Sequence, residues 1–195
     1  MIETLSNLGM LGIIALVAGV VYVALASRKA YVGWYFGILS CAIIFYEDMT
    51  RYGLYADALL QVFYIFMGIQ ALFTWRKVDG EGQLAIQEMP LLWHLHRMAI
   101  LGVIGIVIGF ILAEIPEVNM AVLDTLTSVF AIFATWLMVH RVRSNWLYWI
   151  VIDITYMYIY GMQGAWFYVV LSGVYTVVAV LGWFGWKRSG GLVVR

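Results

Sequence analysis

The stretch GLYADALLQVFYIFMGIQALFTWRK, residues 53–77, decides the fold because a second stretch further along the chain matches it. It can be laid without a gap over GAWFYVVLSGVYTVVAVLGWFGWKR, residues 164–188. The matched pairs keep their size or chemical character: Gly53 with Gly164, Tyr55 with Trp166, Leu60 with Leu171, Tyr64 with Tyr175, Trp75 with Trp186, and Arg76 with Lys187. The preceding segments correspond more loosely, with Arg28 near Arg141. We therefore predict two related units that run the same way through a membrane.

The composition is that of an integral membrane protein. Of the 195 residues, 65% are hydrophobic and only 11% are charged, and apolar runs long enough to cross a bilayer fill most of the chain. The formal net charge is zero, so nothing favours nucleic acid as a partner. The single cysteine, Cys41, excludes an internal disulfide and any multi-cysteine metal site, and we predict neither metal nor cofactor.

Seven membrane spans account for the hydropathy of the chain. We predict them at about 7–26, 31–47, 54–75, 97–115, 120–140, 145–161 and 164–186. Two parallel units need an odd number of spans between them, and the fourth span supplies one. Its Gly105-x-x-x-Gly109 spacing permits close helix packing. The prediction is an all-α membrane protein with a 3+1+3 parallel repeat: a first bundle in 1–77, a linker region in 78–119 and a second bundle in 120–195.

The basic residues predict the orientation. If the N-terminus faces outside, ten of the eleven Lys and Arg residues fall on the inner side, and only Arg51 falls outside. This bias follows the positive-inside rule. We therefore expect a multi-pass protein of the inner (plasma) membrane, with its N-terminus outside and its C-terminus in the cytoplasm.

Polar residues inside the spans are the candidates for a binding site. A carboxylate at mid-membrane costs about 2.5–3.5 kcal/mol on insertion scales, so it usually faces a cavity or a partner. Three spans carry polar and aromatic stripes at helical spacing, and spans 1 and 4 carry almost none. The predicted substrate-binding residues on these stripes are Asp57, Gln61 and Tyr64, then Asp124 and Trp136, and finally Asn145, Trp149 and Asp153.

Each of these residues also has a structural alternative. Trp and Tyr in membrane proteins are most often interfacial anchors, and we expect this role for Trp75 and Trp186. Asp57 and Asp124 lie near the outer ends of their spans, where a carboxylate also stabilises a helix N-terminus. Asp153 is the hardest to explain structurally, because no Lys or Arg lies at a similar depth.

Two tracts resemble the PnuC-type vitamin transporters: LYADALLQVFYIFMGI, residues 54–69, and TWLMVHRVRSNWLYWIVID, residues 135–153. The Asn145-Trp146-x-x-Trp149 element is the most specific part. The resemblance covers nearly the whole chain. It implies a seven-helix fold similar in architecture to the SWEET sugar transporters, assembly as a homotrimer, and facilitated diffusion of an unphosphorylated vitamin that a cytosolic kinase then traps.

A cage of Trp and Tyr rings with one carboxylate suits a flat cationic ligand. Among the substrates of this family, nicotinamide riboside carries a pyridinium and thiamine a thiazolium, and we favour nicotinamide riboside narrowly. A proton-coupled transporter stays open as an alternative, because Asp57, Asp124 and Asp153 could titrate. An enzyme is not expected, because Asp153 with Asn145 forms no acid–base set and no HExxH or GxSxG motif is present.

Overall fold

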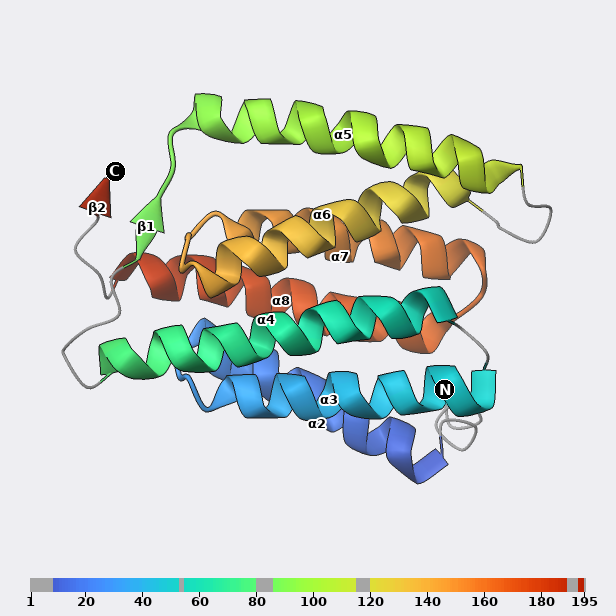
Figure 1. Cartoon of the computed structure of the whole chain (residues 1–195), viewed down its shortest axis with the longest axis horizontal. Helices are drawn as coiled ribbons and strands as arrows, with labels where there is room; N and C mark the ends of the chain where they lie inside the picture. Colours follow the sequence, from blue (N-terminus) through green and yellow to red (C-terminus); the bar gives the residue numbers. More distant parts are fainter. Residues whose placement is uncertain (1–8, 53–54, 80–85, 115–119, 189–192, 195) are drawn as a thin grey trace.

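The computed structural model describes residues 9–52, 55–79, 86–114, 120–188 and 193–194, and these are almost entirely helical (Figure 1). The elements, in chain order, are α2 (Gly9–Ser27), α3 (Gly33–Glu47), the π-helical turn η1 (Asp48–Tyr52), α4 (Tyr55–Asp79), β1 (Gln87–Glu88), α5 (Leu91–Ala113), α6 (Ala121–Val139), α7 (Asn145–Met162), α8 (Trp166–Arg188) and β2 (Val193–Val194). Gly53, Leu54 and the loop 115–119, which the predictions above include, lie outside the described residues.

The seven α-helices correspond to the seven predicted spans. Five of them, α2, α4, α5, α6 and α8, are long and apolar enough to cross a membrane. Helices α3 and α7, with 15 and 18 residues, lie among them in the same bundle. The chain is therefore an all-α, multi-pass membrane protein.

The helices run side by side and alternate in direction (Figure 1). Consequently α2–α3–α4 and α6–α7–α8 have the same sequence of directions, and the start of α2 and the end of α8 lie at opposite ends of the bundle. Contacts between successive helices, together with those of α4 with α6 and of α2 with α8, close a ring of six helices. Helix α5 lies outside this ring and packs mainly against α6.

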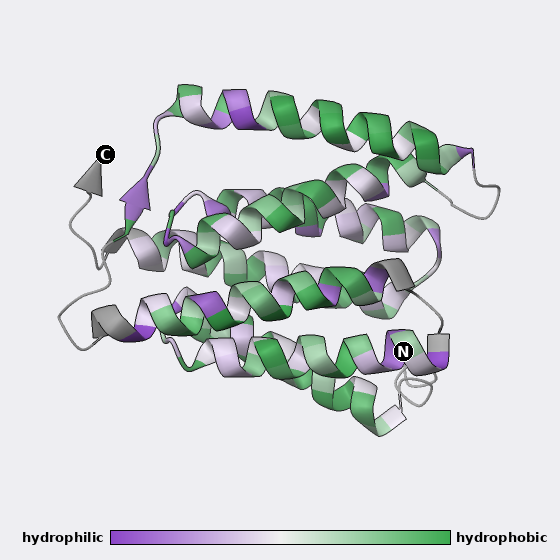
Figure 2. Ribbon diagram, viewed as in Figure 1, coloured by the Kyte–Doolittle hydropathy of each residue, from purple (hydrophilic) through white to green (hydrophobic). Residues whose placement is uncertain are grey.

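Close packing of α5 on α6 depends on the two glycines of the predicted motif. A Cβ on Gly105 would lie 3.2 Å from the Cα of Leu126, and one on Gly109 would lie 2.6 Å from the Cα of Val122. No side chain fits between these backbones, so the prediction of close packing is confirmed. Apolar residues cover most of α5 (Figure 2), as a lipid-facing helix requires.

Trp75 and Trp186 lie in the core, and their assignment as interfacial anchors was wrong. Both are almost completely buried. The indole N–H of Trp75 donates to the carbonyl of Val139 at 3.0 Å, and that of Trp186 donates to the carbonyl of Ala26 at 3.1 Å. Each tryptophan lies near the C-terminal end of the third helix of one unit. Its indole N–H donates to a carbonyl at the C-terminal end of the first helix of the other unit. The two units are thus joined by matching hydrogen bonds.

Each of these residues also meets a tryptophan of the preceding helix. The ring centroids of Trp34 and Trp75 are 5.3 Å apart, and those of Trp146 and Trp186 are 5.4 Å apart, both in edge-to-face geometry. We call these four residues the core tryptophans. When the two units are aligned on these tryptophans, α3 corresponds to α7 with an offset one residue smaller than that of the loose match of Arg28 with Arg141.

Candidate functional site

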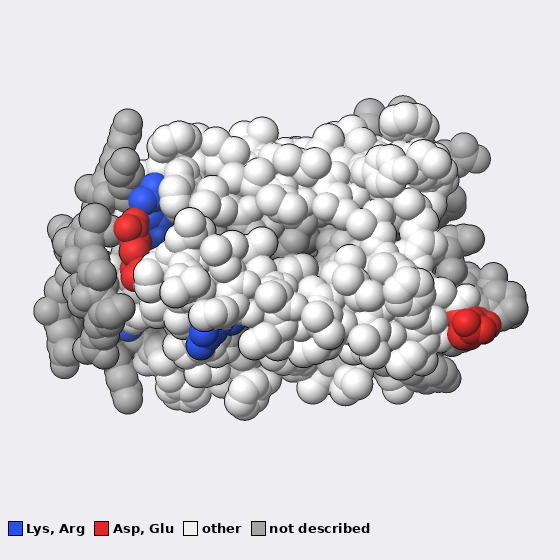
Figure 3. Space-filling view, turned by 90° about the horizontal axis from the view of Figure 1, so that it is seen from above, with Lys and Arg blue, Asp and Glu red and all other residues white. Residues whose placement is uncertain are grey.

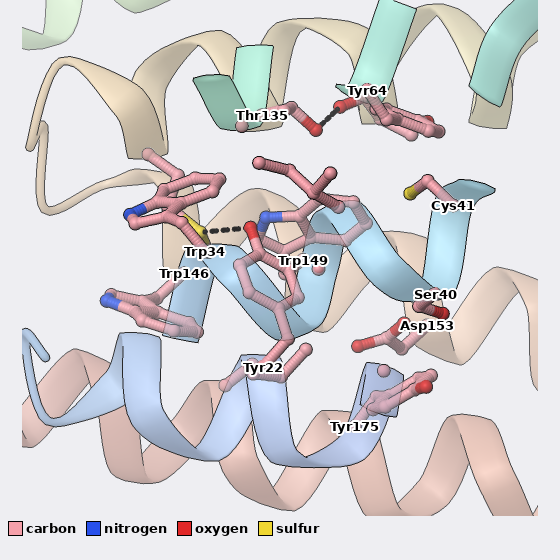
Figure 4. A pocket seen from close by; sticks show the side chains of 18 of the residues that line it. Tyr22, Trp34, Ser40, Cys41, Tyr64, Thr135, Trp146, Trp149, Asp153 and Tyr175 are labelled. Atoms are coloured by element: carbon pink, nitrogen blue, oxygen red, sulfur yellow. Dashed lines mark hydrogen bonds between the residues drawn. The ribbon is translucent and has the colours of Figure 1, made fainter. Parts of the chain in front are cut away.

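A cavity of about 270 Å³ lies inside the six-helix ring (Figure 4), and we call it the central cavity. Every helix of the ring contributes to its wall. Seven aromatic residues line it: Tyr22, Trp34, Tyr64, Trp146, Trp149, Tyr156 and Tyr175. The polar residues of the wall are fewer: Ser40, Cys41, Thr135 and Asp153. No Lys, Arg or His is among the described residues that line the central cavity.

Three of the eight predicted site residues meet in the central cavity. Trp149 and Asp153 lie one turn apart on α7, so both point inward, and Tyr64 reaches the cavity from α4. Asp153 is 5% exposed and lies beside Ser40 and Tyr175 (Figure 4). A buried carboxylate without a facing cation is costly in a membrane, so this wall favours a ligand that brings positive charge.

Trp149 offers the ligand both a ring face and a donor. Its buried indole N–H has no hydrogen-bond partner in the part of the chain that the structure describes. A buried donor without a partner is unfavourable by about 1–3 kcal/mol. By contrast, the hydroxyl of Tyr22, across the cavity, donates to the sulfur of Met138 at 3.2 Å. Trp149 is therefore the better placed of these two residues to hydrogen-bond a ligand.

The core tryptophans form the floor of the central cavity at the C-terminal end of the bundle. Trp34 and Trp146 line the cavity, and Trp75 and Trp186 pack behind them. Arg143 lies at the same end, where its guanidinium contacts Glu88 at 2.7 Å and stacks 3.5 Å over the ring of Trp183. Packed aromatic rings therefore close this end of the six-helix ring.

Asn145 and Gln61 do not line the central cavity. Asn145 is fully buried at the start of α7, and its amide N–H donates to the carbonyl of Val142 at 2.7 Å. Its side-chain oxygen has no partner among the described residues. Gln61 is half-buried on α4, one turn from Tyr64. Neither residue is therefore placed to touch a ligand in the central cavity.

Helix α6 turns a different face to the central cavity than the sequence predicted. Its lining residues are Ala131, Thr135 and Met138. Trp136 points outward, is 37% exposed and stacks on Phe133 at 6.1 Å between ring centroids. Asp124 is exposed near the N-terminal end of the bundle. The structure therefore does not bring these two predicted residues to the cavity.

Asp57 lies in a separate space of about 600 Å³ at the N-terminal end of the bundle, which we call the N-terminal cavity. It is the only predicted site residue among those that line this cavity. Within the described residues, no group of three or more His, Cys, Asp and Glu side chains is placed to hold a metal ion.

Comparison with known proteins assigns the family. Residues 9–188 match the family described as nicotinamide mononucleotide transporter. The chain belongs to this family. The nicotinamide riboside transporters PnuC of Escherichia coli (strain K12) and of Shigella flexneri are each 25% identical to it over 202 residues, which cover 89% of this chain and 83% of theirs. The PnuC-type resemblance predicted from the sequence is confirmed, and these relatives are transporters, not enzymes.

The solved structures support the same assignment at the level of the fold. A chain described as the vitamin B3 transporter PnuC superposes with a TM-score of 0.71 at 21% sequence identity. The superposition covers 94% of the present chain and 82% of the solved one. The seven-helix arrangement is therefore shared with a transporter of known structure.

Several lining residues of this family member were missed from the sequence. Helix α2 was expected to contribute almost nothing, but Gly19 and Tyr22 line the central cavity. Tyr175 was matched to Tyr64 in the internal repeat, so the repeat itself could have predicted its place in the wall. Cys41 carried no signal, because a lone cysteine in an apolar helix resembles ordinary packing.

Proposed function

We propose that this protein carries nicotinamide riboside across the cell membrane by facilitated diffusion, after which a cytosolic kinase traps the vitamin. One observation carries the proposal: among the described residues, the lining of the central cavity has aromatic rings and a single carboxylate, Asp153, but no basic side chain. A pyridinium stacked on Trp149 gains about 0.5–2 kcal/mol from cation–π attraction. Its charge also compensates the buried carboxylate.

The same wall disfavours the phosphorylated form of the vitamin. Nicotinamide mononucleotide carries a phosphate, and a buried anion needs Lys, Arg or a similar partner. The described lining offers none, and Asp153 would repel the phosphate. The names of the two relatives, which specify the riboside, agree with this choice.

Thiamine is the second candidate substrate. Its thiazolium is also flat and cationic, so the ring cage and Asp153 suit it for the same reasons. A proton-coupled mechanism is a further alternative, because Asp57, Asp124 and Asp153 are carboxylates within or near the spans. Uptake that does not respond to an imposed pH gradient would exclude proton coupling.

We also propose that the N-terminal end of the bundle faces the outside of the inner membrane. The basic side chains visible in Figure 3 lie toward the end that holds the C-terminus, and the side chain coloured at the opposite end is acidic. This distribution supports a cytoplasmic C-terminus by the positive-inside rule. A C-terminal fusion to green fluorescent protein should therefore fluoresce, and a dark fusion that is expressed would contradict the orientation.

The proposed architecture is a 3+1+3 parallel repeat of the SWEET type, assembled as a homotrimer. The matching hydrogen bonds of Trp75 and Trp186 and the shared helix directions of the two units support the repeat. The trimer rests on the family resemblance alone, and the mass of the detergent-solubilised protein tests it.

Isothermal titration of the purified full-length protein tests the function. We expect nicotinamide riboside to bind, and the mononucleotide to bind at least about tenfold more weakly, since loss of 1.4 kcal/mol is a factor of ten. Thiamine, titrated in parallel, decides between the two cationic vitamins. Equal affinity for the riboside and the mononucleotide would contradict the role of the central cavity.

A further inference from the structure

The N-terminal cavity is a separate space that adjoins the proposed binding site. Helices α2, α3, α4, α7 and α8 and the turn η1 all contribute to its wall. Two residues, Ser40 and Tyr175, line both this cavity and the central cavity. These two side chains therefore lie where the two spaces meet.

We call Ser40 and Tyr175, which lie between the two cavities, the neck. The hydroxyl of Ser40 donates to the carbonyl of Ala15 at 2.8 Å, which holds it against α2. A Cβ on Gly19 would lie 3.0 Å from the hydroxyl of Tyr175 and 3.4 Å from that of Ser40. Side chains from α3 and α8 therefore converge on a glycine of α2 at this level.

The wall of the N-terminal cavity is acidic. Glu47, Asp48 and Asp57 line it, and no Lys, Arg or His is among its described lining residues. Arg51 contacts Glu47 at 3.5 Å, but its side chain is 49% exposed and lies outside the lining. Three carboxylates facing one space produce a negative potential that attracts cations.

Asp48 is the carboxylate that most needs a partner. It is 5% exposed, and its Oδ2 has no hydrogen-bond partner in the part of the chain that the structure describes. Burial, with smaller contributions from Asp57 and Glu47, raises the pKa of the Asp48 carboxyl. A cation in the cavity would stabilise the ionised form of Asp48, so the unpartnered oxygen itself points to a positively charged ligand.

Aromatic rings on the opposite wall complete a site for an organic cation. Tyr160 on α7 and Phe167 on α8 line the same cavity as the three carboxylates. Carboxylates on one side and rings on the other are the two groups that bind a flat cation in water-accessible sites. A small inorganic cation would use the carboxylates but not the rings.

We propose that the N-terminal cavity is a second, transient site for the cationic ring of the substrate, in which Asp48 and Asp57 capture the ligand before it passes the neck of Ser40 and Tyr175. The proposal rests on the proposed function, because it takes a cationic vitamin as substrate and the N-terminal end as the outer side. Capture at this site increases the rate of delivery to the central cavity and selects against neutral and anionic analogues.

Uptake kinetics of Asp48→Asn in proteoliposomes test the proposal. The two substrates are nicotinamide riboside and its dihydro form, whose ring has a similar shape but no charge. We expect Asp48→Asn to lower kcat/KM for the riboside by about threefold to thirtyfold, to spare the dihydro form, and to weaken the dependence of uptake on ionic strength. Affinity for the riboside in titration should change less than kcat/KM, because the central cavity is intact.

Glu114→Gln is the matched control, since it removes one exposed acidic charge at the same end of the bundle but not from either cavity. It should leave both substrates unchanged. Equal losses for both substrates in Asp48→Asn, or no loss for either, would overturn the capture site while the proposed function stands. A wild-type protein that neither binds nor transports the riboside would instead refute the proposed function, and the capture site with it.

Discussion

The two three-helix units share their scaffold but differ at two positions that face the central cavity. Counted from its core tryptophan, α3 has Gly37 at the third position, where α7 has Trp149. At the seventh position α3 has Cys41, where α7 has Asp153. All four residues line the central cavity. At these two positions the ring face and the charge therefore come from the second unit, and the first unit contributes a glycine and a thiol.

This difference shows how a repeated fold can bind an unsymmetrical ligand. The core tryptophans are alike because both units must close the same floor. At the cavity level the units need not match, since a nucleoside has one charged ring and one sugar. Gly37 also serves packing: a Cβ there would lie 3.0 Å from the ring of Tyr22. The small residue on α3 thus admits a ring from α2.

Replacing the charge on α7 should have the largest effect. Asp153→Asn keeps the size and hydrogen-bonding capacity of the side chain but deletes its charge. We expect affinity for nicotinamide riboside to fall by about 1.5–3 kcal/mol, the usual range for a hydrogen bond to a charged group, or roughly tenfold to a hundredfold. Binding of the uncharged dihydro form should be spared, and titration of both ligands in one variant measures the difference.

Cys41→Ala is the matched control on α3, because it changes the equivalent position without removing a charge. We expect a loss of less than about tenfold, and the same loss for both ligands. If Asp153→Asn weakens the charged and uncharged ligands equally, the two units do not differ in charge recognition and Asp153 has a structural role.

The second effect concerns how the units pack. A Cβ on Gly182 would lie 2.5 Å from the indole ring of Trp146, whereas one on Gly68 would lie 2.8 Å from Cγ1 of Ile38. A buried indole cannot move aside as an aliphatic side chain can. We expect Gly182→Ala to lower the free energy of unfolding by about 1–3 kcal/mol, and Gly68→Ala by less.

Thermal unfolding in detergent measures both variants. Gly102→Ala is the control, because a Cβ at that position meets nothing within 4 Å. A larger loss at Gly68 than at Gly182 would mean that the first unit, not the second, is the more tightly packed.

The sequence predicted the helices better than it predicted their inward faces. Asn145 was predicted to begin the sixth span and begins α7, and Trp149 and Asp153 share a face as their spacing requires. Polar residues in apolar helices carry this signal because burial in lipid would be costly. Trp75 and Trp186 were misassigned, because an indole at a helix end has the same hydropathy whether it faces headgroups or a neighbouring carbonyl.

The faces of α2 and α6 could not be predicted for a related reason. Helix α2 contributes Gly19 and Tyr22, which lack the charge that marks a cavity. On α6, Trp136 was predicted because it shares a helical stripe with Asp124, whereas the residue that lines the cavity, Thr135, lies on the neighbouring face. Which of two adjacent faces turns inward depends on the neighbouring helices, and their positions are a property of the tertiary structure.

The third effect distinguishes aromatic rings that contact the ligand from rings that lie on the outer face of the bundle. Trp149→Ala should weaken binding of nicotinamide riboside by about 0.5–2 kcal/mol through loss of the stacked indole. Trp136→Ala, on the outer face of α6, should leave affinity unchanged. Titration of both variants compares them directly. Equal losses of affinity would mean that Trp136 belongs to the binding site, as the sequence predicted.

The smallest effect tests whether the hydrogen bonds of Trp75 and Trp186 contribute equally to stability. Trp75→Phe and Trp186→Phe each remove one hydrogen bond, to Val139 and Ala26 respectively, and the same part of a buried ring. A typical intramolecular hydrogen bond contributes about 0.5–1.5 kcal/mol to stability, so we expect two similar losses in the free energy of unfolding.

The two rings are also in contact, with centroids 5.8 Å apart, so the double variant should depart from additivity. Chemical unfolding of the three variants measures these terms. Losses that differ by more than about 1 kcal/mol would show that the matching hydrogen bonds do not hold the units together in an equivalent way.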